Sequence, residues 1–268
     1  MTKAKYSISS IRSMISSFDK LLRNADVEGF SKSKKDVILN EFSAIREFSE
    51  VFPKHYLKRT DAIDRIDYLR TLSTNPRTII DVGVNKGTPK LYRAFAELPF
   101  VLIDPAFEGE ERLTVKPENY TYVNKAVGDH QDTQILHDNS GKSSLLEPKG
   151  EFKIWEAHSK YEVQIDRLDT ILTEVEAEPP YGVKLDVQGY ELKAVRGMTK
   201  IMPKIDFLIC ETNIRNTAEG TYQFSELVAE LLKHDFLFFN FLNNFKSNAR
   251  YYDVVFLHRS NVKFNRLD

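Results

Sequence analysis

The sequence has little cysteine and no excess of charge of either sign. Its single cysteine, Cys210, excludes an internal disulfide and a cysteine-based zinc site. Because Cys210 ends an apolar run that starts at Ile205, we expect a buried, inert thiol. The 38 Lys and Arg residues nearly balance the 39 Asp and Glu residues, for a formal net charge of −1. This balance gives no electrostatic argument for a nucleic-acid partner, although a local basic face stays open.

Long apolar runs are also missing. No stretch approaches the roughly 20 consecutive apolar residues of a membrane span. The N-terminus carries Lys3 and Lys5 but lacks the apolar region of a secretory signal, so we expect a cytoplasmic protein without a membrane span. Neither an internal repeat nor a low-complexity segment stands out.

The chain of 268 residues is long enough for one sizeable domain with an appendage. Residues 1–70 carry apolar side chains at helical spacing and differ in character from residues 71–268, so we expect an N-terminal helical segment and a main domain. The helical segment is expected to pack as a layer on the main domain. The alternative is a cap that covers substrate or forms a homodimer.

The rest of the chain is organised around a strand, a glycine turn and a helix. Thr78–Val82 is a β-branched, apolar run typical of a buried parallel strand. A turn with Gly83 and Gly87 follows, and Thr88 is a candidate N-cap for a helix over the apolar positions of 91–98. A glycine turn before a helix N-terminus is typical of a site that binds a nucleotide-like ligand.

The spacing in this turn differs from a dinucleotide fingerprint, which requires G-x-G-x-x-G. Asn85 stands between Gly83 and Gly87, and Asp81 lies two residues before the first glycine. An acid at that position can receive the positive end of a ligand, which favours an ammonium or sulfonium group over a pyrophosphate. The alternative is a tight turn that binds no ligand.

A second apolar strand over residues 99–103 ends at Asp104, 21 residues after Gly83. In nucleotide-binding α/β folds, an acid at this point accepts hydrogen bonds from ribose hydroxyls. The alternative is an ordinary turn that begins with Asp104 and Pro105.

The remaining pattern predicts further strands that mostly alternate with helices. A helix is expected to start at Asp169 as its cap, and another is expected to end near Gly197. The last two strands, 236–242 and 251–258, should be antiparallel because their connection is too short for a helical crossover. The sequence therefore predicts an α/β fold: a doubly wound sheet of seven principal strands with an antiparallel edge.

Five motifs, in this order, make residues 77–258 resemble S-adenosylmethionine-dependent methyltransferases of the FkbM type. They are Asp81–Gly87, Asp104-Pro105, Ala126–Asp129, Arg167–Thr170 and Lys184–Glu191. The resemblance implies a Rossmann-like class I methyltransferase sheet and S-adenosyl-L-methionine as the cofactor. Three positions depart from the family pattern: Lys86 replaces an apolar residue, Asp104 replaces a more common Glu before Pro105, and Gln188 replaces a common Glu.

The resemblance also implies roles for individual residues. The methionine part of the cofactor would lie against Asp81, Gly83, Asn85 and Gly87. The ribose would lie at Asp104, and the adenine at Ala126, Val127 and Asp129. Lys184 and Asp186 would lie where the methyl group meets its acceptor.

Two acids, Asp186 and Glu211, end neighbouring predicted strands and are the candidate catalytic residues. Because a sulfonium already activates the methyl group, the protein must mainly align an acceptor oxygen and remove its proton. Either acid could be the base or the orienting group. Two alternatives stay open: that these acids and Asn213 hold a divalent ion, and that Glu211 only anchors a loop.

These features favour O-methylation of a hydroxyl on a sugar or another small molecule. Two other classes of protein share part of the pattern. An NAD-dependent oxidoreductase would use the same strand, turn and Asp104. This alternative does not explain why Asn85 stands where the middle glycine is required, or why the chain closes with a hairpin. A non-catalytic binding module could keep the fold alone.

Overall fold

The computed structural model describes residues 70, 75–139, 143–147, 159–214, 218–243 and 250–264. Apart from Arg70, the predicted helical segment over residues 1–70 lies outside the described residues. None of the described helices is long and apolar enough to cross a membrane.

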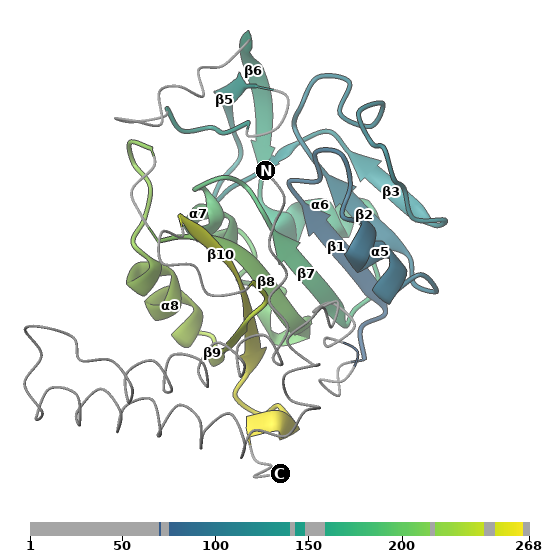
Figure 1. Ribbon diagram of the computed structural model, residues 1–268, viewed down its shortest axis with the longest axis vertical. Coiled ribbons are helices and arrows are strands. Elements are labelled where there is room, and N and C mark those ends of the chain that lie inside the picture. Colours follow the sequence, from purple (N-terminus) through teal and green to yellow (C-terminus); the bar gives the residue numbers. More distant parts are fainter. Residues whose placement is uncertain are drawn as a thin grey trace, which may run out of the picture. The chain divides into compact units, whose positions relative to one another are not determined.

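The described residues build one large sheet of seven strands in the order β3-β2-β1-β7-β8-β10-β9 (Figure 1). The first five strands in this order, which end with β8, are parallel to one another. Strand β10 runs antiparallel to both of its neighbours, β8 and β9. This arrangement confirms the predicted doubly wound sheet with its antiparallel edge. The strands, in sheet order, are Tyr120–Val123, Phe100–Ile103, Thr78–Val82, Tyr181–Leu185, Ile205–Asn213, Tyr251–His258 and Phe236–Phe241.

Helices cover both faces of this sheet. Helices α6 (Leu168–Glu174), α7 (Glu191–Arg196) and α8 (Phe224–Leu232) pack their apolar sides on one face. Helix α5 (Pro89–Ala94) packs on the other face, over side chains from β1, β2, β8 and β10. Short 3₁₀ turns lie at Met202–Lys204 and Val262–Phe264. All five residues of β1 are buried, as expected for a strand covered on both faces.

A second, three-stranded sheet stands beside the ends of the large one (Figure 1). It consists of β4 (Ala126–Val127), β6 (Ser159–Asp166) and β5 (Asp132–Asp138), with β6 in the middle. The small sheet is held together by pairing between β5 and β6, which are separated in sequence by residues 139–158.

Two local predictions were wrong. The helix after Thr88 ends at Ala94 and not near residue 98. The cap of α6 is Arg167, and Asp169 lies inside the first turn. The Asp169 carboxylate instead accepts hydrogen bonds from the backbone N–H groups of Lys200 and Ile201, so a tertiary contact replaces the local capping bond. Cys210 is fully buried, as predicted, and burial raises the pKa of its thiol.

Candidate active site

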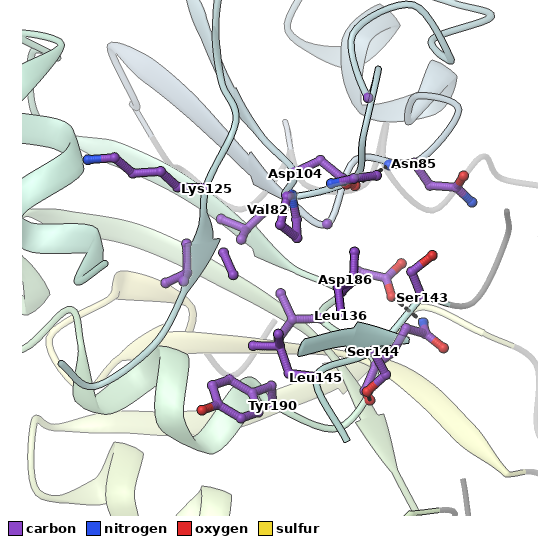
Figure 2. A pocket seen from close by; sticks show the side chains of 18 of the residues that line it. Val82, Asn85, Asp104, Lys125, Leu136, Ser143, Ser144, Leu145, Asp186 and Tyr190 are labelled. Atoms are coloured by element: carbon purple, nitrogen blue, oxygen red, sulfur yellow. Dashed lines mark hydrogen bonds between the residues drawn. The ribbon is translucent and has the colours of Figure 1, made fainter. Parts of the chain in front are cut away.

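A pocket lies where β1, β2 and β7 end, because the carboxyl ends of parallel strands meet at one edge of a sheet. Figure 2 shows Asn85 and Asp104 along one wall of this pocket and Leu136 and Leu145 along the opposite wall. The small sheet thus supplies one wall and the large sheet supplies the other. The lining residues are Val82, Gly83, Asn85, Asp104, Pro105, Ala106, Gly109, Arg112, Lys125, Ala126, Val127, Leu136, Ser143, Ser144, Leu145, Asp186, Val187, Gln188 and Tyr190.

The glycine turn after β1 is packed tightly against the end of β7. Gly83 has a φ of 79°, and a Cβ there would lie 1.9 Å from the backbone oxygen of Asp186. No side chain fits at this position, so glycine is required for the two strand ends to approach each other. Asn85 also adopts a left-handed conformation, with a φ of 49°, and its backbone N–H donates to Asp104 Oδ2 at 2.8 Å.

Asp104 fixes the turn and also faces the pocket. Its Oδ1 accepts a hydrogen bond from the backbone N–H of Ala106 at 2.9 Å, so each carboxylate oxygen is held by one donor. Burial raises the pKa of Asp104, against the lowering effect of these two hydrogen bonds. Each oxygen keeps a second lone pair, so the carboxylate can accept two hydroxyl hydrogen bonds from a vicinal diol.

Asp81 lies beneath the turn and does not line the pocket. It is fully buried, and its Oδ2 accepts a hydrogen bond from the Tyr92 hydroxyl at 2.9 Å. Its Oδ1 makes no hydrogen bond and lies 3.7 Å from Lys184 Nζ. The Lys184 ammonium group supplies the positive charge beside this buried oxygen, so the two side chains form an ion pair.

A network of charged and polar side chains begins at Asp186. Lys184 Nζ lies 3.1 Å from Asp186 Oδ2, and Gln188 Nε2 donates to Asp186 Oδ1 at 2.7 Å. The same Gln188 amide donates to Glu211 Oε2 at 2.6 Å. Glu211 also shares a hydrogen bond with Asp186. The two candidate catalytic acids are therefore in direct contact.

This network separates the protonation states of the two acids. Burial would raise the pKa of Asp186, but the Lys184 charge and the hydrogen bonds from Glu211 and Gln188 hold it below its ordinary value. Burial and the neighbouring Asp186 raise the pKa of Glu211 to about 10. The Lys184 ammonium group beside Asp186 therefore favours the ionised form of Asp186 and places the proton of the pair on Glu211.

The surroundings of this pair are rich in carboxyl groups. Asp253 on β10 lies opposite Glu211 on β8, and burial raises the pKa of Asp253. Within the described part of the chain, no group of three or more His, Cys, Asp or Glu side chains has an arrangement that could hold a metal ion.

The structure brings six of the predicted site residues together in the pocket: Gly83, Asn85, Asp104, Ala126, Val127 and Asp186. Lys184 and Glu211 contact Asp186 from outside the lining. Gly87 lies away from the pocket, where a Cβ would meet the backbone oxygen of Val115 at 2.4 Å. Asp129 also lies outside the lining, and its carboxylate hydrogen-bonds with His130 Nδ1 at 2.7 Å.

The sequence reasoning missed an ion-pair clamp at the rim of the pocket. Arg112, in the loop after β2, makes two hydrogen bonds of 3.2 and 2.8 Å to the carboxylate of Asp138 on β5. Ser143 and Tyr161 donate to the same carboxylate, which is almost fully buried. The clamp ties the large sheet to the small one. No local signal could have found it, because Arg112 and Asp138 are 26 residues apart.

Three solved structures are similar to the chain. Magnesium protoporphyrin IX methyltransferase from Synechocystis PCC 6803, with bound SAM, shares 11% identity at a TM-score of 0.39 over 96% of this chain and 100% of the other. A TehB-like SAM-dependent methyltransferase from Corynebacterium glutamicum shares 10% identity at a TM-score of 0.40 over 76% and 97%. The plantazolicin methyltransferase BpumL, in complex with SAH, shares 8% identity at a TM-score of 0.38 over 92% and 98%.

No curated protein matches the chain. The model of the methyltransferase FkbM domain matches residues 81–238, which is more than half of the chain. The match spans the glycine turn, Asp104, Asp186 and Glu211, which are the residues that build the pocket and the carboxyl pair beside it. The protein therefore belongs to the FkbM family of S-adenosylmethionine-dependent methyltransferases.

Proposed function

We propose that the protein transfers the methyl group of S-adenosyl-L-methionine to a hydroxyl group of a sugar or another small molecule. The observation that carries this proposal is that the Asp186 carboxylate lines the pocket, with Lys184 Nζ at 3.1 Å and Gln188 Nε2 at 2.7 Å from its two oxygens. An ionised carboxylate accepts the hydrogen bond of an acceptor hydroxyl and so aligns its oxygen. It also holds the proton that the hydroxyl loses during transfer.

The cofactor would be held by the residues on the glycine-turn side of the pocket. Asp104 would bind the ribose diol, Gly83 and Asn85 would lie against the methionine part, and Ala126 and Val127 would contact the adenine. When bound, S-adenosyl-L-methionine supplies a methyl group that its sulfonium has already activated. The chain's own task is then to align the acceptor and to accept its proton.

The charges around the pair favour an acceptor without negative charge. Asp81, Asp186 and Asp253 act on the ammonium group of Lys184, and Lys90 also acts on Asp253, so among these described residues the acids outnumber the cations. A carboxylate or phosphate on the acceptor would be repelled at this end of the pocket. A neutral hydroxyl is not repelled, and Asp186 can accept its hydrogen bond.

Calorimetry on the full chain tests the cofactor assignment. S-adenosylhomocysteine should bind, and NAD should not. NAD binding without S-adenosylhomocysteine binding would instead support an oxidoreductase.

The acceptor is tested next, with neutral sugars and other hydroxylated small molecules, by measuring S-adenosylhomocysteine release. Release that depends on a hydroxylated acceptor supports the proposal. Cofactor binding without turnover on any of these acceptors would support a non-catalytic module.

A further inference from the structure

The turn between β7 and α7 has an unfavourable backbone conformation. Gln188 has a φ of 50° and Gly189 has a φ of 100°, so two consecutive residues lie in the left-handed region. For a residue with a side chain, such as Gln188, this conformation is sterically unfavourable. The fold must therefore hold the turn from outside.

Glu191 provides that support from the buried side. Its Oε1 accepts hydrogen bonds from the backbone N–H groups of Val187 at 3.1 Å and of Gly189 at 3.2 Å. Its Oε2 accepts the Tyr222 hydroxyl at 2.9 Å and lies 3.1 Å from the Gly189 nitrogen. Glu191 is fully buried, and all of these donors need the carboxylate as an acceptor.

The turn held in this way carries groups that the pocket uses. Val187 and Gln188 line the pocket, and the Gln188 amide donates to both Asp186 and Glu211. On the pocket side, Ser144 Oγ donates to the backbone oxygen of Gln188 at 2.9 Å. A shift of the turn would move Gln188 away from the two acids and change the shape of the pocket wall.

We propose that Glu191 is a positioning residue for the active site: its carboxylate holds the Val187–Gly189 turn so that Gln188 reaches Asp186 and Glu211. This proposal rests on the proposed function, because it assigns Glu191 to the same pocket. Glu191 does not line the pocket, and its hydrogen bonds reach the pocket through the turn.

The ionisation of Glu191 gives the proposal a distinctive signature. Burial raises the pKa of Glu191 to about 7, against the lowering effect of the Gly189 and Tyr222 hydrogen bonds. The charge of Asp186 also raises the pKa of Glu191, and the charge of Glu191 raises the pKa values of Cys210 and Glu211. Protonation turns one acceptor oxygen into a donor, so the grip on the turn weakens as the pH falls through about 7.

The test measures the affinity of the full chain for S-adenosylhomocysteine between pH 6 and pH 8.5, together with melting temperature. Wild type should bind more tightly as the pH rises through about 7. Glu191→Gln keeps the side-chain size but loses one acceptor oxygen, so its affinity for S-adenosylhomocysteine should be about tenfold lower than that of wild type at pH 8. Because the amide does not ionise, the variant should also lack the increase in affinity near pH 7, which we call the step. Tyr222→Phe keeps the carboxylate and removes a hydrogen bond that lowers its pKa, so the step should move to higher pH.

Asp169→Asn is the matched control. Asp169 is also a buried carboxylate that accepts two backbone N–H groups, from Lys200 and Ile201, but it lies outside the pocket lining. This variant should lose stability and keep both the wild-type affinity and the step near pH 7.

Wild-type affinity and an unchanged pH profile in both Glu191→Gln and Tyr222→Phe would overturn the proposal and leave the proposed function standing. If the wild type itself fails to bind S-adenosylhomocysteine at any pH, the proposed function falls, and the role of Glu191 falls with it.

Discussion

Two motifs of the chain use the same kinds of residue for different purposes. Arg167–Thr170 and Lys184–Glu191 each combine a basic side chain with a buried or partly buried carboxylate. In the first motif, Asp169 accepts hydrogen bonds from Arg167 and from two backbone N–H groups after α7. In the second, Asp186 pairs with Lys184 but also lines the pocket.

The difference lies in what each carboxylate has left to bind. Asp169 is enclosed by its hydrogen-bond partners Arg167, Lys200 and Ile201, and only 4% of its side chain is exposed. Asp186 keeps 27% of its side chain exposed at the pocket edge. A motif that is typical of a family can therefore serve the fold alone, and the structure around each acid tells the two uses apart.

The largest expected effect is that of Asp186→Asn on turnover. The amide keeps the size of the side chain but cannot hold the proton of the acceptor, so kcat should fall on the order of 10²-fold or more. S-adenosylhomocysteine affinity should change little, and the variant should stay folded. A stable variant with full turnover would remove Asp186 from the mechanism.

Asp104→Ala should act on cofactor affinity. Loss of its carboxylate removes hydrogen bonds to the ribose and the bond that fixes the Asn85 backbone, so S-adenosylmethionine binding should weaken by roughly 1.5–3 kcal/mol. Calorimetry measures this directly. Unchanged affinity would show that the ribose lies elsewhere.

Asp169→Asn should act on stability alone. The amide nitrogen of the variant cannot accept the hydrogen bonds that a carboxylate oxygen receives, so buried donors around residue 169 are left without an acceptor. This should lower the free energy of unfolding by about 1–3 kcal/mol. Denaturant unfolding gives this value. A loss of kcat in the folded variant would mean that the first motif also serves the site.

Within the carboxyl pair, Glu211→Gln should have the smaller effect on turnover, and it should change the pH dependence of stability. Because the folded-state pKa of Glu211 is raised to about 10, the stability it contributes is present below its ordinary pKa and is lost as the pH rises toward 10. The amide cannot ionise, so the variant should lose less stability between pH 5 and pH 10. Asp186, whose pKa is lowered, is ionised in both the folded and the unfolded state across this range, so it adds no pH dependence there.

That pH prediction is checked by melting temperatures of wild type and variant across the same range. A variant whose melting temperature falls with pH as steeply as that of the wild type would show that Glu211 does not carry the proton.

Local patterns in the sequence predicted the elements that depend on local sequence. The apolar run of Thr78–Val82 matches β1, and the last strand matches β10 from Tyr251 to His258. The antiparallel edge followed from the short connection between the last two strands. The positions of Gly83, Asp104 and Asp186 at strand ends were enough to bring them to one edge of the sheet.

Contacts between distant segments could not be predicted in this way. The small sheet and the pair of Arg112 and Asp138 depend on pairing across tens of residues. Gln188 was read as a departure from a pattern, although its amide joins the two acids. Glu191 carried only a weak signal, an acid two residues after Gly189 at the start of a helix.

The central claim is that Asp186 is the ionised acceptor of the proton and Glu211 its neutral partner. The most direct test compares kcat for Asp186→Asn and Glu211→Gln with the same acceptor at saturating cofactor. Because a glutamine amide can still donate to Asp186 as the neutral acid does, Glu211→Gln should keep kcat within about tenfold of wild type, while Asp186→Asn loses on the order of 10²-fold or more. Equal losses in the two variants, or a larger loss in Glu211→Gln, would contradict the account.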